Sequence, residues 1–266
     1  FKGKENLINI GKKNTKNKTV VIAFLCRNIS ECFYFSKKRI EKICDQFKDY
    51  NIIIFENDSK DNSRKLLKKW TKQNPKVHLI KCKDNPKCKF NVNEGYSIGF
   101  NKKKRINNMT MYRNMYMKCI WKNKKYYQKD FLMVLDFDLV GGISINGLHY
   151  SMAKSSKWDG ISINGLMFIP PLGIRSRTYD GMAFRHKWNV THNSLIDRYI
   201  LMNKLISNSK RNFIKVASSF NGLAIYHMDA VRNLYYSVPD EPYLCEHIGL
   251  HKSMYNNGYS SFYISK

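Results

Sequence analysis

The first 140 residues alternate between short apolar runs and segments whose apolar residues recur at helical spacing. Four runs have the length and composition of buried strands, at 20–25, 51–55, 77–80 and 131–135. We expect helices between them, beginning near Ser30 and Asp61 and spanning 108–122. This alternation favours an α/β fold, in which right-handed crossovers build an open, twisted, mostly parallel sheet flanked by helices.

Polar side chains follow three of these predicted strands at the point where each strand ends. Arg27 and Asn28 follow the first strand, residues 56–59 (ENDS) follow the second, and Asp136 and Asp138 follow the fourth. Ligands of open α/β sheets bind outside the carboxyl ends of the strands, so we expect these clusters to form one site. No GxGxxG motif follows the first strand, which counts against a dinucleotide-binding domain.

Asp136 and Asp138 are separated by a single residue in the segment FLMVLDFDLVGG (131–142). Side chains two residues apart at a strand end point to the same side, so both carboxylates can bind one ligand. Mg²⁺ and Mn²⁺ commonly take one or two carboxylates together with substrate phosphates. Taken alone, the motif is equally compatible with an acidic loop after a core strand.

The second half of the chain has a less regular pattern. We expect helices and strands to alternate there less strictly, with a loop over 167–177 because it contains Pro170, Pro171 and Gly173. Residues 1–18 are polar and basic and predict a leader or linker. The remainder, 19–266, is expected to be one domain. The elements predicted after residue 142 are helices at 143–153, 195–208 and 245–254 and strands at 159–163, 213–217 and 223–226.

The net charge of +27 favours a polyanionic partner or a phosphate-bearing substrate. The lysines are scattered and accompany the Asn, Ile, Tyr and Phe of A/T-rich codons, which weakens the case for nucleic acid as the main ligand. No apolar run approaches the ~18 residues of a membrane span. Seven cysteines without a CxxC motif indicate a cytoplasmic, reducing compartment, although a disulfide between Cys82 and Cys88 is compatible with the sequence.

The order of the motifs resembles that of nucleotide-sugar glycosyltransferases of the Rossmann-like GT-A fold. The resemblance covers about residues 19–266, is more specific in the first half, and is closest to fungal capsule-associated α-1,3-mannosyltransferases and glycosyltransferases of large DNA viruses. It implies transfer of a hexosyl or pentosyl group from a nucleoside-diphosphate sugar to a glycan or protein acceptor. The motifs that carry it are RN at 27–28, ENDSKD at 56–61, RN at 113–114, DFD at 136–138, YD at 179–180 and EH at 246–247.

The resemblance implies a donor half over 19–142 and an acceptor half over 143–266. A cofactor cation, Mn²⁺ or Mg²⁺, would bind Asp138, with Asp136 on the metal or the ribose. Asp58 and Ser59 could instead cap the following helix, and Arg113 could belong to a solvated helix face. The expected donor-binding residues are Arg27, Asn28, Glu56, Asp58, Ser59, Arg113, Asn114 and Asp136.

The resemblance also implies a general base on the acceptor side if the transfer inverts the anomeric configuration. Glu246 is the first candidate and Asp180 the second, or an acceptor contact. His247 or His251 would be a third metal ligand, against the alternative of ordinary core or surface histidines. Further acceptor-side candidates are Asp240, Glu241 and residues 220–222, the last equally compatible with a hairpin turn.

Two other functional classes are compatible with the sequence. A nucleotidyltransferase would also use paired carboxylates and Mg²⁺, but CRNIS after the first strand lacks the glycine- and lysine-rich loop that such enzymes use. A non-catalytic basic module would bind RNA or DNA with a steep salt dependence.

Overall fold

The computed structural model describes residues 3–82, 102–139, 142–168, 174–178, 180–191, 194–239, 241 and 244–266. An eight-stranded sheet forms its centre, in the order β3-β2-β1-β4-β9-β5-β10-β8. The strands are β1 (Thr19–Cys26), β2 (Asp49–Glu56), β3 (Val77–Lys81), β4 (Phe131–Leu135), β5 (Gly160–Ile163), β8 (Phe213–Lys215), β9 (Leu223–His227) and β10 (Phe262–Ser265). The helices are α1 (Glu5–Lys16), α2 (Phe33–Cys44), α3 (Ser63–Gln73), α4 (Lys102–Trp121), α5 (Lys124–Tyr127), α6 (Ile145–Met152), α7 (Leu195–Asn208), α8 (Met228–Val231) and α9 (Glu246–Asn256).

The sheet is mixed, and the α/β fold class predicted from the sequence is confirmed. Strands β3, β2, β1 and β4 run parallel, whereas β9 runs antiparallel to both β4 and β5. Leu223 at the start of β9 pairs with Leu135 at the end of β4. The segment before β9 therefore lies at the same sheet edge as the carboxyl ends of β1, β2 and β4.

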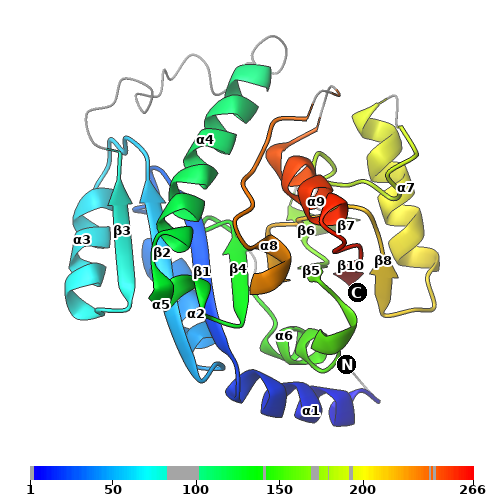
Figure 1. Ribbon diagram of the computed structural model, residues 1–266, viewed down its shortest axis with the longest axis horizontal. Helices are drawn as coiled ribbons and strands as arrows, with labels where there is room; N and C mark the ends of the chain where they lie inside the picture. The colour runs from blue at the N-terminus through cyan, green and yellow to red at the C-terminus, as the bar shows by residue number, and fades with distance from the viewer. Residues whose placement is uncertain are drawn as a thin grey trace.

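Helices cover both faces of the sheet (Figure 1). The alternation of side chains along β1 separates two cores: Val21 and Ala23 pack with residues of α4, α7 and α9, and Val20, Ile22 and Phe24 pack with residues of α2, α3 and α6. These completely buried strands match the continuous apolar runs of the sequence.

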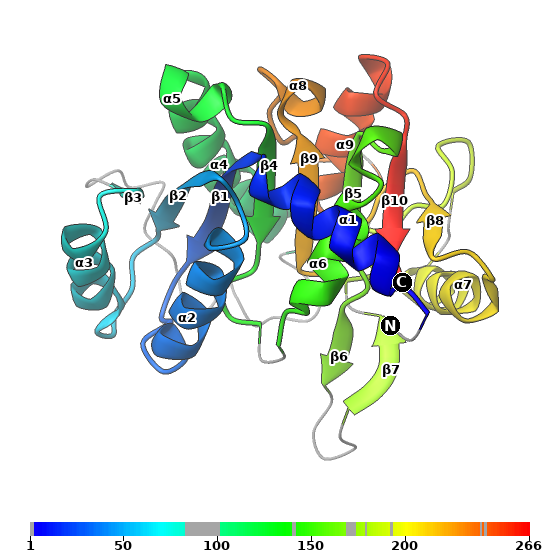
Figure 2. The same ribbon diagram turned by 90° about the horizontal axis from the view of Figure 1, so that it is seen from below.

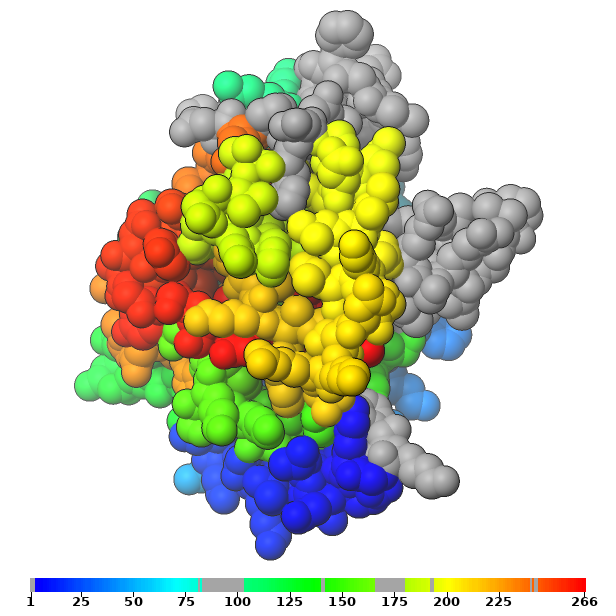
Figure 3. All heavy atoms as spheres, turned by 90° about the vertical axis from the view of Figure 1, so that its right-hand side faces the viewer, coloured from blue at the N-terminus to red at the C-terminus, as the bar shows by residue number. Residues whose placement is uncertain are grey.

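Most of the N-terminal segment, which was predicted to be a leader or linker, forms helix α1. Helix α1 packs against α6 (Figure 2), and Figure 3 shows it at the base of the molecule. Gly11 lies so close to α6 that a Cβ atom would stand 1.6 Å from the carbonyl oxygen of His149. Asn14 donates to the carbonyl of Met152 over 3.2 Å, and Thr15 is completely buried. The contact uses small and polar residues, which is why apolar periodicity did not reveal it.

The predicted loop at 167–177 is wrong. Strands β6 (Leu166–Phe168) and β7 (Ile174–Thr178) pair as an antiparallel ribbon that stands off the main sheet (Figure 2). Pro170, Pro171 and Gly173 lie outside the described residues.

Two further predictions concern membranes and cysteines. Within the described ranges, no helix is both long and apolar enough to cross a bilayer. Cys26, Cys32, Cys44, Cys119 and Cys245 are free thiols, but Cys82 is disulfide-bonded. Cys82 is one of the two cysteines for which the sequence left a disulfide open.

Candidate functional site

The three polar clusters do lie at one edge of the sheet. Cys26 at the end of β1 pairs with Glu56 at the end of β2, and β4 is the neighbour of β1 on its other side. The turn before β9 completes this edge, because the amide of Asp136 donates to the carbonyl of Gly222 over 2.9 Å.

The loops after β1 and β2 are joined by hydrogen bonds between their own residues. Glu56 is 1% exposed and accepts from the Ser59 amide and the Arg64 Nε, both at 2.7 Å. Ser59 Oγ accepts from the amide of Asn28 over 3.1 Å, and Asn28 Oδ1 accepts from the Lys60 amide over 2.8 Å. Glu56, Ser59 and Asn28, expected to contact a donor, thus organise the two loops.

Asp61 ties this pair of loops to the helices that follow them. Its Oδ2 accepts from the amide and hydroxyl of Ser30 at 3.0 and 2.6 Å, and its Oδ1 accepts from the Ser63 amide at the start of α3. Although burial acts to raise it, the pKa of Asp61 lies well below its ordinary value because these hydrogen bonds favour the carboxylate. Ser30 thus binds Asp61 rather than capping α2, which begins at Phe33.

Asp58 and Arg27 remain on this edge as partly exposed residues. Asp58 is in the left-handed region (φ 46°), as is Asn28 (φ 51°), a conformation that Asp and Asn adopt more readily than most residues. The Asp58 side chain is 22% exposed and lies 3.1 Å from Lys60 Nζ. At the start of α3, the Ser63 amide donates to Asp61 Oδ1 over 3.0 Å.

The second cluster centres on Arg113, which is buried rather than on a solvated helix face. Its Nε donates to Oε1 of Glu246 over 2.6 Å, and its Nη2 lies 3.6 Å from Oδ1 of Asp136. The guanidinium also lies over the rings of Phe220 and Tyr236, at 5.3 and 5.6 Å from their centroids. Arg113 therefore connects α4, the end of β4 and the start of α9.

Two of the carboxylates around Arg113, Asp136 and Asp180, have raised pKa values. Burial raises the pKa of Asp136 to about 6, with Asp138 and Glu246 adding to the effect and Arg113 opposing it. Burial likewise raises the pKa of Asp180 to about 7, together with the charges of Asp136 and Glu246. Asp180 has a positive φ of 62°, and Asp138 is exposed. The site thus gathers more negative charge than Arg113 balances.

Asn114 serves a structural role, contrary to the prediction that it binds a donor. Its Nδ2 donates to the carbonyl of Tyr236 over 2.9 Å, and its Oδ1 accepts from the amide of the same residue over 2.8 Å. This pair of bonds fixes the segment after α8 against α4 and places the Tyr236 ring over Arg113.

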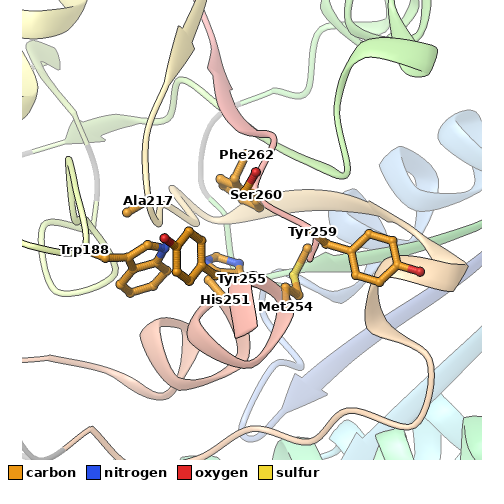
Figure 4. A pocket seen from close by; sticks show the side chains of 8 residues that line it. All are labelled: Trp188, Ala217, His251, Met254, Tyr255, Tyr259, Ser260 and Phe262. Atoms are coloured by element: carbon orange, nitrogen blue, oxygen red, sulfur yellow. The ribbon is translucent and has the colours of Figure 1, made fainter. Parts of the chain in front are cut away.

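His251 is a core residue, and the prediction of a metal ligand does not fit its contacts. The hydroxyl of Ser218 donates to the carbonyl of Ala183, so it accepts from Nδ1–H of His251 over 2.6 Å. The Tyr226 hydroxyl then donates to Nε2 over 2.9 Å. Burial lowers the pKa of His251 to about 3, which keeps the ring neutral. The cavity beside it (Figure 4) has a volume of about 10 Å³, enough for one water molecule.

His247 differs from His251 because neither of its ring nitrogens has a hydrogen-bond partner among the described residues. The ring stacks on Phe220 at 3.8 Å between centroids, and Nε2 lies 3.8 Å from Oε1 of Glu246. Burial, together with the positive charge of Arg113, lowers the pKa of His247 well below its ordinary value. His247 is thus a neutral ring at the edge of the carboxylate cluster.

The other acceptor-side candidates have mixed positions. Glu241 pairs with Arg185. Residues 220–222 form the buried turn that holds Asp136, with Asn221 at φ 55° donating to the carbonyl of Ile163 over 2.9 Å. Tyr179 and Asp240 lie outside the described residues. The aromatic neighbours Phe220 and Tyr236 were missed as parts of an arginine site, because nothing local in sequence links them to Arg113.

The fit of this edge to a divalent cation is partial. Across the ranges that the structure describes, no group of three His, Cys, Asp or Glu side chains is arranged to hold a metal ion. Two carboxylates, Asp136 and Asp138, are nevertheless at the strand end, and the pKa of Asp136 is raised by burial and by the neighbouring carboxylates Asp138 and Glu246. Such a pair suits a hard cation whose remaining ligands come from phosphates and water.

Comparison with known proteins supports the resemblance seen in the sequence. Residues 36–99 match the family model described as glycosyl transferase family 2. A comparison with curated protein sequences finds no match.

A comparison with solved structures finds matches at low sequence identity. A mannosyltransferase from Pyrobaculum calidifontis, PcManGT, in complex with GDP-Man and Mn²⁺, is 10% identical with a TM-score of 0.50, over 95% of this chain and 58% of that one. TarS (1–349) from S. aureus is 14% identical with a TM-score of 0.46, over 93% and 57%. The chain thus spans less than two thirds of each of these structures. The similarity to the Pyrobaculum enzyme is one of fold, and it confirms the predicted GT-A fold class.

Proposed function

We propose that this protein transfers a glycosyl group from a nucleoside-diphosphate sugar to a glycan or protein acceptor. The observation that carries the proposal is the surplus of carboxylates beyond the end of β4. Asp136, Asp180 and Glu246 gather around Arg113, and Asp138 acts on Asp136. The family-model match and the shared fold support it.

In this proposal Asp136 and Asp138 hold a divalent cation together with the donor diphosphate. The cation supplies Lewis-acid stabilisation of the charge that develops on the departing diphosphate. Arg113 keeps Asp136 in place and partly offsets its charge, while the exposed Asp138 meets the donor from solvent. The Pyrobaculum enzyme was solved with GDP-Man and Mn²⁺, which makes these the first ligands to test.

The loops after β1 and β2 would form the nucleoside side of the site. Glu56 and Asp61 hold these loops in one conformation, which lowers the entropy cost of binding. Asp58 and Arg27 are the partly exposed groups of this region and would contact the ribose or the phosphates.

Asp180 is the better candidate for the general base if the transfer inverts the anomeric configuration. Its pKa of about 7 places proton uptake near neutral pH, where a general base is most effective. Glu246 is 4% exposed and accepts from Arg113, so its role would be to position the guanidinium. His247 would contact the donor or the acceptor through a ring nitrogen, and we do not assign it as a metal ligand.

The proposal is tested by incubating the protein with GDP-Man and UDP-sugars in the presence of Mn²⁺ and measuring release of the nucleoside diphosphate. Asp138→Asn should lower the rate by about 100-fold, the scale seen when transition-state charge loses one stabilising group. Asp229→Asn is the matched control, because this carboxylate is 75% exposed on α8. Release of pyrophosphate instead would indicate a nucleotidyltransferase, and full turnover in Asp138→Asn would exclude the metal role.

A further inference from the structure

A second cavity lies on the opposite face of the sheet from the Arg113 cluster. Its volume is about 250 Å³. Its floor comes from β4, β9 and β5, and α6 with the residues before it forms one wall. The side chains that make it apolar are Ile43, Met133, Ile143, Leu148, Ile161, Ile163, Leu223 and Ile225.

The cavity is partly open to solvent, and its lining is largely apolar. Binding of an apolar molecule against this lining is favourable because it removes apolar surface from water. Apolar cavities of ~150 Å³ stay dry and bind molecules such as benzene. The cavity under α6 is larger, so a bound apolar molecule of about ten non-hydrogen atoms would fill it.

Two residues that line the cavity, Ser162 and Asn164, each carry a buried polar atom without a hydrogen-bond partner among the described residues, Ser162 Oγ and Asn164 Oδ1. The hydroxyls of Ser151 and Ser265, which also line it, bond to each other over 2.9 Å. An unsatisfied buried acceptor is costly, and a ligand that donates one hydrogen bond would remove that cost.

We propose that this cavity binds an aliphatic alcohol of about nine or ten non-hydrogen atoms, with its chain among the isoleucines and its hydroxyl donating to Asn164 Oδ1. The end of a lipid-derived alcohol has the same chemistry, a hydrocarbon chain with one hydrogen-bond donor. This site shares no residue with the carboxylate cluster, so its test does not depend on whether the proposed transferase activity is correct.

The test is isothermal titration calorimetry of the whole chain with 1-octanol and with its methyl ether. We expect saturable binding of 1-octanol and binding of the ether weaker by about 5-fold, because the ether cannot donate. Asn164→Leu should remove this difference. Ile163→Phe, at a half-buried strand end, should fill the space and abolish binding, while Ile10→Phe on α1 should leave it unchanged.

Absence of saturable 1-octanol binding to the wild-type chain would overturn the proposal, and this result needs no variant to fold. Equal binding to wild type and folded Ile163→Phe would place the ligand elsewhere and also overturn it. Equal affinities for the alcohol and the ether in the wild-type chain would overturn the role of Asn164. A longer chain, 1-dodecanol, separates the sources: tighter binding with length indicates a lipid-derived chain that extends out of the cavity, and loss of binding indicates a free alcohol.

Discussion

Two acidic clusters lie at the same edge of the sheet and have opposite electrostatic character. In the loops after β1 and β2, Glu56 and Asp61 accept hydrogen bonds from nearby amides and hydroxyls, and the pKa of Asp61 is lowered. Around Arg113, the pKa values of Asp136 and Asp180 are raised by burial and by neighbouring carboxylates. The first cluster stabilises the fold. In the second cluster, the protein's own groups do not balance the negative charges of the carboxylates.

This difference indicates which carboxylates are available to bind a ligand. Carboxylates whose partners are all supplied by the protein gain nothing from a cation, but mutually repelling carboxylates do. Perturbed pKa values at a sheet edge are typical of functional sites. The comparison therefore supports our proposal that DFD binds a ligand, whereas Glu56 and Asp61 of ENDSKD organise the loops, although both motifs look equally acidic in the sequence.

Removing Arg113 should have the largest effect on stability. Arg113→Met leaves Glu246 buried without its partner and should lower the free energy of unfolding by about 3–5 kcal/mol, measured by urea denaturation. The matched variant Arg64→Met removes the partner of Glu56 in the other cluster. Because the Arg64 side chain is 47% exposed and screened by solvent, it should cost only about 1 kcal/mol. A larger loss in Arg64→Met than in Arg113→Met would contradict the comparison.

The pH dependence of stability should have opposite signs for Asp136 and Asp61. The pKa of Asp136 rises from 3.8 to about 6 on folding, so the unfolded chain releases its proton first and stability falls as pH rises from about 4 to 6. The cost above pH 6 is at most about 3 kcal/mol. Asp136→Asn should therefore raise the free energy of unfolding at pH 8 and leave it unchanged at pH 3.5.

For Asp61, whose pKa is lowered on folding, the contribution to stability is present above its ordinary pKa and disappears as pH falls. The two variants are compared by denaturation across pH 3 to 8. A stability of Asp136→Asn that tracks the wild type at every pH would show that Asp136 is not under electrostatic strain.

Loss of Asp61 should have a moderate effect. Asp61→Ala removes the acceptor for Ser30 and for the first turn of α3, and the loss of a comparable cap costs about 1 kcal/mol. The melting temperature should fall by about 2–4 °C. Asp45→Ala, at the C-cap of α2, is the control. A stabilised Asp61→Ala would remove the distinction between the two clusters.

The smallest expected effect concerns His247. His247→Phe keeps the stacking on Phe220 and breaks no hydrogen bond, so the free energy of unfolding should change by less than about 1 kcal/mol. His251→Phe is the contrast, since it leaves Ser218 and Tyr226 without their partner in the core. If His247→Phe lowers the affinity for Mn²⁺, the ring is a metal ligand and the cluster is larger than we propose.

The sequence predicted the fold where its signal is local, as it is in the apolar runs and in the motifs at the strand ends. The strands at 20–25, 51–55 and 131–135 follow from continuous burial, which leaves a simple pattern. Helix α1 was missed because its contact depends on Gly11 and Thr15 rather than on an apolar stripe.

The sequence predicted which strand ends lie together, but it predicted the contacts of the side chains there less well. Asp136 and Arg113 do meet, but the burial of Arg113 against Glu246, 133 residues away in the chain, cannot be inferred from either local segment. Asn114 and His251 look like donor and metal ligands until their partners, Tyr236 and Ser218, are placed beside them by the fold. Which hydrogen bonds are already made is a tertiary property.

The central claim is that the carboxylates after β4, unlike those after β2, bind a cation together with a diphosphate. Calorimetric titration of GDP and UDP, with and without Mn²⁺, tests it most directly. We predict binding that requires Mn²⁺ and that weakens at least about 10-fold in Asp138→Asn but not in Asp229→Asn. Nucleoside diphosphate binding that is equally tight without metal, or unchanged in Asp138→Asn, would contradict the account.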